Sequence, residues 1–180
     1  MIYMLLADGF EEIEALTPLD LLRRAGQEIL TVSITSERAV TGAHGITVLA
    51  DLTKDTLTHV CDEMLILPGG MPGTKNLDAS RTVDAALRAA NANGAYLAAI
   101  CAAPMVLGKR GYLKGKEATC FPGFEEYLEG ATLSKARVVT DGRTVTAAGM
   151  GVAMEFGLAL VALLQGKDAA ERLRSAVLAD

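Results

Sequence analysis

Short runs of consecutive apolar residues alternate along this chain with longer segments in which apolar residues recur every three or four positions. Runs of roughly four to six apolar residues, bounded by Gly, Pro or Asp, are typical of strands buried on both faces of a sheet. Recurrence at three and four positions is typical of helices that cover such a sheet. The pattern predicts strands at residues 2–6, 28–34, 64–67 and 95–100, and helices at 11–25, 80–93 and 151–165.

The remaining segments carry more local signals. Asp141-Gly142 is the strongest turn signal of the chain and predicts a hairpin of strands 137–140 and 144–147. Asp168, with Glu171 three residues later, predicts a capped last helix. Ser80 is a candidate cap for the helix at 80–93. We also expect weak edge strands within 40–49, a helical turn at 55–59, a helix from Ala102 and a strand at 117–121.

Strands that alternate with helices from one end of the chain to the other predict an α/β fold. Such a pattern gives a mostly parallel sheet covered by helices on both faces. No linker, internal repeat or low-complexity segment divides the sequence. We therefore expect residues 1–180 to form one domain, a length that suits a single folded unit.

Cys101 directly follows the predicted strand 95–100 and precedes a predicted helix. In open α/β sheets, binding sites form beyond the carboxyl ends of the strands. A helix N-terminus presents unpaired N–H groups and the positive end of a dipole, so it favours an anion. A thiol in such a place has a pKa of about 3.5–7.5 rather than about 8.5. Cys101 is therefore a candidate nucleophile, and the alternative is a small buried hydrophobic residue at a strand end.

Glu14 lies early in the first predicted helix, four residues before Pro18. Pro18 has no N–H to donate to the Glu14 carbonyl, so we expect a bend that leans Glu14 over a neighbouring strand end. The positive end of the helix dipole is enough to explain Glu11 and Glu12. If Glu14 reaches Cys101, the two acids cannot both ionise cheaply and titrate as a pair. We expect the proton to reside on Glu14, which then acts as general acid or base beside a thiolate.

Gly69 and Gly70 follow the predicted strand 64–67. Two glycines at a strand end let the backbone approach a ligand closely. Their N–H groups, together with that of Ala102, could form an oxyanion hole beside Cys101. A double glycine alone is usually only a turn, and this pair is of interest because it ends a strand of the same sheet.

Composition narrows the classes of function. The net charge is −5, aromatic residues make up 4% and there is no Trp, so we expect no nucleic-acid binding. Cys61, Cys101 and Cys120 lack C-x-x-C spacing, and His44 and His59 are unpaired, so we expect neither a disulfide framework nor a metal site. The first strand has no basic leader, and no apolar run reaches the about 20 residues that span a bilayer. We therefore expect a cytoplasmic protein that does not enter a membrane.

Three segments together resemble the ThiJ/PfpI superfamily, and within it the DJ-one branch with its bacterial YajL-like members. They are Asp8-Gly9-Phe10-Glu11-Glu12-Ile13-Glu14, Leu67-Pro68-Gly69-Gly70 and Ala98-Ala99-Ile100-Cys101-Ala102-Ala103-Pro104. The resemblance covers essentially the whole chain. It implies a flavodoxin-like, doubly wound fold related to class I glutamine amidotransferases. It also implies a homodimer, often with the first helix near the partner chain.

The resemblance further implies that Cys101 is an oxidisable nucleophile, that Glu14 is its protonated partner, and that Gly69, Gly70 and Ala102 supply backbone donors. It implies a glutathione-independent glyoxalase, or a deglycase that acts on methylglyoxal or glyoxal adducts, without a metal or organic cofactor. The substrate is then a small dicarbonyl or a glycated molecule. The alternatives are a non-catalytic redox sensor or redox-regulated chaperone that uses oxidation of Cys101, and a structural protein with an inert thiol.

The chain departs from the family pattern near the expected site. Some relatives carry a histidine in the loop that here reads Cys120-Phe121-Pro122-Gly123. Ala148 and Met150 stand where relatives often have a larger polar residue and a proline, which predicts a more apolar pocket. Ala102 follows the cysteine where the peptidase branch has histidine, and no histidine follows His59, as glutaminases require. Peptidase and glutaminase activities are therefore disfavoured.

Overall fold

The computed structural model describes residues 1–57 and 61–179 of the chain. Within that part, seven strands form one sheet in the order β10-β11-β7-β6-β1-β2-β5. Neighbouring strands run parallel except β10 and β11, which form an antiparallel hairpin at one edge. The mostly parallel sheet predicted from the sequence is confirmed. Its strands are β1 (Ile2–Leu6), β2 (Ile29–Ser33), β5 (Leu52–Thr53), β6 (Met64–Leu67), β7 (Tyr96–Ile100), β10 (Val138–Asp141) and β11 (Thr144–Ala147).

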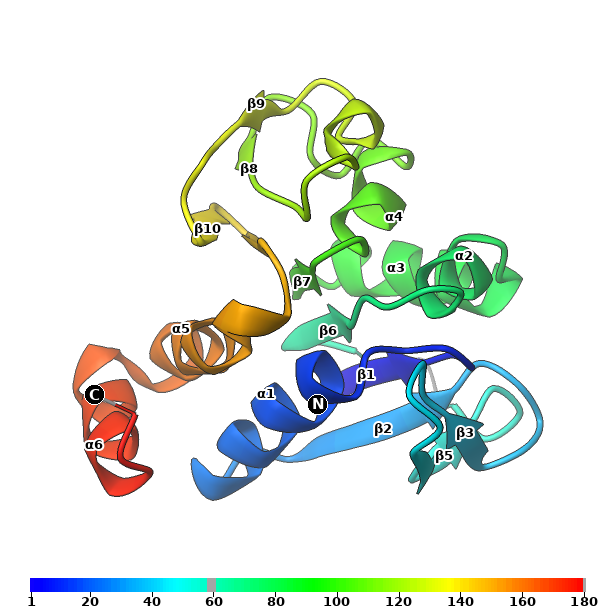
Figure 1. Cartoon of the computed structure of the whole chain (residues 1–180), viewed down its shortest axis with the longest axis horizontal. Helices are drawn as coiled ribbons and strands as arrows, with labels where there is room; N and C mark the ends of the chain where they lie inside the picture. Colours follow the sequence, from blue (N-terminus) through cyan, green and yellow to red (C-terminus); the bar gives the residue numbers. More distant parts are fainter. Residues whose placement is uncertain (58–60, 180) are drawn as a thin grey trace.

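Helices cover both faces of this sheet, with α1 and α5 on one side and α2, α3 and α4 on the other (Figure 1). The last helix, α6, packs against α5. This is the doubly wound arrangement that the alternating pattern predicts. The helices are α1 (Glu12–Arg24), α2 (Gly73–Asp78), α3 (Arg81–Ala92), α4 (Pro104–Gly108), α5 (Ala153–Gln165) and α6 (Lys167–Ala176), with 3-10 turns η1 (Glu125–Tyr127) and η2 (Met150–Val152).

β1 shows why the central strands are apolar without interruption. Ile2, Met4 and Leu6 pack into the core beneath α1 and α5, whereas Tyr3 and Leu5 pack into the core beneath α3 and α4. Successive side chains of a strand point to opposite faces, so a strand covered on both sides needs apolar residues at every position. The continuous runs of the sequence are therefore the central strands of this sheet.

The structure differs from the prediction at the periphery. Segment 40–49 does not join the main sheet, because β3 (Ala39–Thr41) and β4 (Thr47–Leu49) pair with each other. The edge next to β2 is instead β5, whose two residues are too few to produce a pattern. The strand predicted at 117–121 is reduced to β8 (Glu117–Ala118), which pairs with β9 (Thr132–Leu133) in a separate sheet.

Helix ends follow the cap chemistry only in part. Ser80 caps α3 as predicted, and its hydroxyl accepts the Val83 N–H at 3.4 Å. The cap of α6 is Gly166, at φ 90°, and not Asp168. The helix expected from Ala102 begins at Pro104 after a tight turn, and the short α2 was not predicted. Residues 58 and 59 of the helical turn expected at 55–59 lie outside the described residues.

No helix in the described ranges combines the length and the apolar character that a bilayer-spanning segment needs.

Candidate active site

The carboxyl ends of β6 and β7 lie side by side in the sheet, with β1 beside β6 and β11 beside β7. This arrangement places the residues that follow these four strands at one edge, where sites of open α/β sheets form. Gly69 follows β6, Cys101 follows β7, and Gly149 follows β11. Glu14 reaches the same edge from α1, the helix that follows β1. The sequence residues singled out for chemistry therefore meet at one place.

Cys101 occupies a strained backbone position. Its φ is +64°, in the left-handed region that non-glycine residues rarely adopt. The conformation is held on both sides, because its N–H donates to the Ala147 carbonyl at 2.9 Å and its own carbonyl accepts the Phe121 N–H at 2.8 Å. Of the three cysteines, all within the described residues, Cys61 and Cys120 are buried and Cys101 is partly exposed. The turn thus presents one sulfur to the outside of an otherwise buried strand end.

Glu14 is almost fully buried, with 1% of its surface exposed. Its Oε2 accepts the Gly69 N–H at 3.0 Å, across a sequence separation of 55 residues. Its Oε1 has no hydrogen-bond partner among the described residues. The carboxyl is close enough to Cys101 for each group to shift the pKa of the other. The Gly69 N–H therefore fixes one oxygen, and the carboxyl also lies beside the Cys101 sulfur and the Met150 backbone.

Burial dominates the acid–base properties of this pair. It raises the pKa of Glu14 from 4.5 to about 7. Burial, followed by the charge of Glu14, raises the pKa of Cys101 from 9.0 to about 12. The prediction of a lowered thiol pKa is therefore wrong. The physical reason is that α4 has only five residues and the N–H groups of Ala102 and Gly70 do not offset the loss of solvent.

Glu14 and Cys101 titrate as a coupled pair. The pair loses its first proton near pH 7 and its second only at high pH, so it holds one proton and one negative charge in between. The two values belong to the pair rather than to either group, so the proton expected on Glu14 stays a prediction; in the form with the proton on the sulfur, Glu14 is ionised. Glu14 is then placed to take the thiol proton when the sulfur attacks, and a base with a pKa near 7 suits that task.

The three backbone donors predicted around Cys101 divide between two partners. The N–H of Gly69 is engaged by Glu14, whereas those of Gly70 and Ala102 interact with the Cys101 sulfur. A Cβ at Gly69 would lie 2.5 Å from Glu14 Oε2 and 2.7 Å from the Cys101 Cβ. Position 69 therefore needs glycine because the backbone passes directly between the acid and the nucleophile.

Two residues that sequence reasoning did not assign to the site lie beside the sulfur. A Cβ built at Gly149 would lie 4.0 Å from Cys101 Sγ and 3.1 Å from Cδ2 of the Phe121 ring. Gly149 follows a strand next to β7, so the predicted hairpin contained a signal for it. Phe121 lies in the loop that the family resemblance placed near the site, but the strand pattern gave no signal for it, because the strand expected to end there is not part of the main sheet.

Glu12 has a structural role that the helix dipole does not describe. It is buried, and its carboxylate accepts the His44 N–H at 2.8 Å and contacts His44 Nδ1 at 2.9 Å. Burial alone would raise the pKa of Glu12, but these hydrogen bonds and that of the Ile46 N–H lower it to about 2. Ligand atoms of Glu11, Glu12 and His44 lie within 4.8 Å of one another. The hydrogen bonds explain this arrangement as an anchor for the β3–β4 loop.

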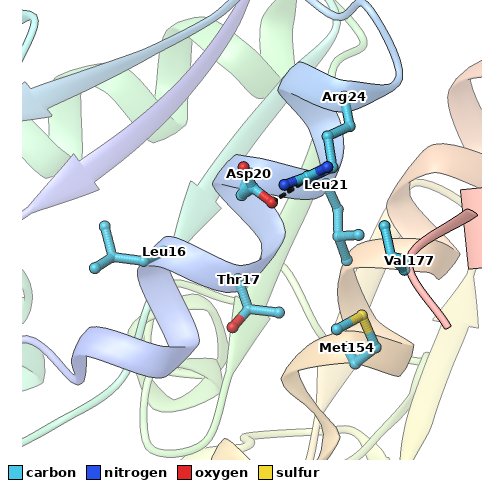
Figure 2. A pocket seen from close by; sticks show the side chains of 7 residues that line it. All are labelled: Leu16, Thr17, Asp20, Leu21, Arg24, Met154 and Val177. Atoms are coloured by element: carbon cyan, nitrogen blue, oxygen red, sulfur yellow. Dashed lines mark hydrogen bonds and ion pairs between the residues drawn. The ribbon is translucent and has the colours of Figure 1, made fainter. Parts of the chain in front are cut away.

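Two of the surface hollows beside α1 lie near the candidate site or along the opposite part of the helix. One, of about 250 Å³, is lined by Glu11, Ile13, Ile46 and Met150, among others. The other, of about 430 Å³, lies between α1 and the side chains of Met154 and Val177, and an ion pair of Asp20 with Arg24 runs along its α1 side (Figure 2). Cys101 and Glu14 line neither hollow, so both hollows are separate from the candidate site at the strand ends.

Comparison with known proteins agrees with this geometry. Residues 1–163 match the model of the DJ-1/PfpI family. The chain is 38% identical over 166 residues to Protein DJ-1 homolog B of Arabidopsis thaliana, covering 91% of this chain but 38% of that protein. It thus spans less than half the length of this plant relative. It is 31% identical to a protein named deglycase from Pyrococcus abyssi, over 81% of this chain and 87% of that protein.

Among solved structures, oxidized Toxoplasma gondii DJ-1 superposes with a TM-score of 0.94 at 32% identity, covering 98% of this chain and 97% of that one. The α/β fold is accordingly the one related to class I glutamine amidotransferases. The family model matches most of this chain, and Cys101 at the turn after β7 lies beside Glu14 of α1. The chain therefore belongs to the DJ-1/PfpI family.

Proposed function

We propose that the protein is a cysteine-dependent enzyme of the glyoxalase or deglycase type, acting on methylglyoxal, glyoxal or their adducts. The observation that carries this proposal is the buried Glu14 carboxyl, with one fixed and one unpartnered oxygen, beside the Cys101 sulfur. A nucleophile adjacent to a base with a pKa near 7 suits addition to a carbonyl followed by proton transfer. The name of the Pyrococcus relative is consistent with this chemistry.

The reaction needs no partner besides water. The Cys101 sulfur forms a bond to the aldehyde carbon as its proton passes to Glu14, and Glu14 returns that proton to the oxygen, giving a hemithioacetal. Glu14 then removes the hydrogen on the same carbon, and the resulting enediol takes up a proton at the neighbouring carbon. The oxygen on the sulfur-bearing carbon loses its proton, which leaves a thioester. Water attacks the thioester and releases a hydroxy acid and the thiol. For methylglyoxal the product is lactate, and the oxidation of one carbon balances the reduction of the other.

Backbone groups can stabilise the oxygen that becomes negative during addition. The N–H groups of Gly70 and Ala102 face the sulfur, so they are the candidates for this role. Gly69, whose N–H binds Glu14, acts instead as a positioning residue. No metal or organic cofactor is part of this proposal.

Replacement of the nucleophile tests the proposal directly. We expect Cys101→Ser to abolish production of lactate from methylglyoxal, and Cys120→Ser, at a buried thiol, to retain it. Circular dichroism at matched concentrations is the check that both variants are folded. Full turnover in folded Cys101→Ser would exclude the mechanism.

A redox sensor that uses the same sulfur is the second candidate function. Cys101 is partly exposed, whereas the thiols of Cys61 and Cys120 are buried, and this difference in exposure favours selective oxidation of Cys101. After mild peroxide treatment, mass spectrometry is expected to find a two-oxygen adduct on Cys101 before Cys61 or Cys120. Simultaneous oxidation of all three would remove the support for a sensor.

We also propose that the protein is a homodimer of a reducing compartment such as the cytoplasm, and a YajL-like member of its family. Exposed apolar side chains of α1, of the β3–β4 hairpin and of η2 support the dimer, since Ile13, Ile46, Leu49 and Met150 are each about half exposed or more. The three cysteines without disulfide partners are consistent with a reducing compartment. Sedimentation of the wild-type chain beside Ile13→Glu tests the dimer, which this charge should dissociate.

A further inference from the structure

The accessible side of the Cys101 sulfur is bordered by Gly149 and the Phe121 ring. The Cβ that Gly149 lacks would lie 4.0 Å from Sγ and 3.1 Å from the edge of the ring. Gly149 itself is buried, and its φ of 163° is an extended conformation open to any residue. Space, and not backbone strain, is therefore what a side chain at position 149 would take away. Gly149 therefore lies close to both the sulfur and the ring, and a side chain there would take up the space between them.

The backbone fixes Phe121 at this place. Its N–H donates to the Cys101 carbonyl at 2.8 Å, so the residue is attached to the nucleophile residue itself. The Phe121 side chain nevertheless remains 46% exposed. A large apolar ring that is only half buried contributes less to the core than a fully buried one, but it presents an apolar surface to any molecule that approaches the sulfur.

The charge around the site is negative. The charge of Glu11 raises the pKa of Glu14, and the charge of Glu14 raises that of Cys101. Glu11 is held close, because its N–H donates to the Gly69 carbonyl at 2.9 Å and its side chain is mostly buried. The charges of Glu11 and Glu14 repel an anionic substrate, whereas a neutral carbonyl compound is not repelled.

We propose that Phe121 and Gly149 form an apolar gate over Cys101 that admits small uncharged carbonyl compounds and excludes bulky or anionic ones. This inference rests on the proposed function, since it specifies the substrate class of the same site. A neutral α-oxoaldehyde with a short apolar substituent fits the gate: its aldehyde carbon reaches the sulfur and its substituent packs against the ring. An anionic aldehyde such as glyoxylate is rejected by Glu11 and Glu14, and a bulky one by the Phe121 ring.

Alkylation of Cys101 tests the gate without any turnover. Three reagents that share one reactive group are compared: iodoacetamide, its bulky N-tert-butyl derivative and anionic iodoacetate. Mass spectrometry of the Cys101 peptide gives each rate, and the rates with glutathione correct for intrinsic reactivity. We expect both the bulky and the anionic reagent to be disfavoured on the order of tenfold or more relative to iodoacetamide.

Variants separate size from charge. Phe121→Ala should raise the relative rate of the bulky reagent about tenfold, Gly149→Ala should lower it further, and neither should change the discrimination against iodoacetate. Glu11→Gln should raise the relative rate of iodoacetate alone. Phe124→Ala, in the same loop with its ring against Tyr127, is the matched control and should leave all ratios unchanged. Phe121→Leu keeps an apolar side chain and should fall between Ala and the wild type.

The outcomes distinguish the gate from the proposed function. Equal corrected rates for the three reagents in the wild type, or a Phe121→Ala variant that behaves like Phe124→Ala, would overturn the gate. In turnover, Phe121→Ala should gain activity toward phenylglyoxal relative to methylglyoxal, and glyoxylate should be a poor substrate. Complete inactivity toward every aldehyde, together with the predicted alkylation pattern, would reject the proposed function and retain the gate.

Discussion

The free energy of unfolding of Glu14→Gln, compared with that of the wild type, should be higher at pH 8 than at pH 4.5. Burial raises the pKa of Glu14 in the folded protein from 4.5 to about 7. Between these values the folded protein holds a proton that the unfolded chain has released, so stability falls as the pH rises. The contribution is fully present below pH 4.5 and is lost as the pH passes through about 7.

The size of the effect follows from the same pKa values. The interval from 4.5 to about 7, at about 1.4 kcal/mol for each pH unit, corresponds to about 3 kcal/mol. Glutamine does not titrate and lacks this loss. The free energy of unfolding of Glu14→Gln minus that of the wild type should therefore increase by about 3 kcal/mol between pH 4.5 and pH 8. At pH 8 the variant should also turn over methylglyoxal on the order of 10²- to 10⁴-fold more slowly, because it lacks the base.

Urea unfolding at pH 4.5, 6 and 8 measures the difference, with equal slopes required of both proteins. The raised pKa of His44 also affects stability near neutral pH, but it is common to both proteins and cancels in the difference. Glu155→Gln, which alters a surface pair with Arg137, is the control and should show no such trend. A difference between Glu14→Gln and the wild type that stays constant within about 0.5 kcal/mol would refute the reasoning.

Two further predictions concern glycines at close approaches. Gly69→Ala should abolish turnover and destabilise the fold by about 1–3 kcal/mol, because its Cβ would lie 2.5 Å from Glu14 Oε2; an active, stable variant would contradict the site geometry. Gly157→Ala should lower the free energy of unfolding, measured by urea unfolding, by about 1–2 kcal/mol despite the helix propensity of Ala. The reason is that its Cβ would lie 2.6 Å from Leu21 Cδ1 and 3.0 Å from Pro18 Cα. Stabilisation by Gly157→Ala would show that α1 and α5 can separate there without cost.

The parts of the fold that were predictable are those in which burial acts on every residue of a segment. β6 was predicted with its bounds because its four residues are all buried between two helical layers. β5 and β8 were missed or misplaced because two residues cannot establish a period, and their partners are set by tertiary contacts. The link between Glu12 and His44 joins residues 32 positions apart, and no local pattern encodes it.

The site was predictable in position but not in its electrostatics. Cys101 and Gly69 follow strands, so the pattern placed them at one edge of the sheet, whereas Glu14 was linked to them by the bend expected from Pro18 and by the family resemblance. The acidity of the thiol depends on how much solvent the neighbouring elements exclude, which the order of residues does not reveal. A turn that looked favourable to a thiolate proved to be too short and too buried to produce one.

The Gly69–Glu14 hydrogen bond joins segments 55 residues apart, and Cys101 arrives from a third segment. The reacting groups therefore come into register only when β1, β6 and β7 are all paired. Fragments of the chain, or a permuted chain opened between these strands, would have to rebuild the entire sheet centre before any turnover returned. The proposed activity should consequently disappear in step with the global loss of structure, and its loss would report how cooperatively this protein assembles.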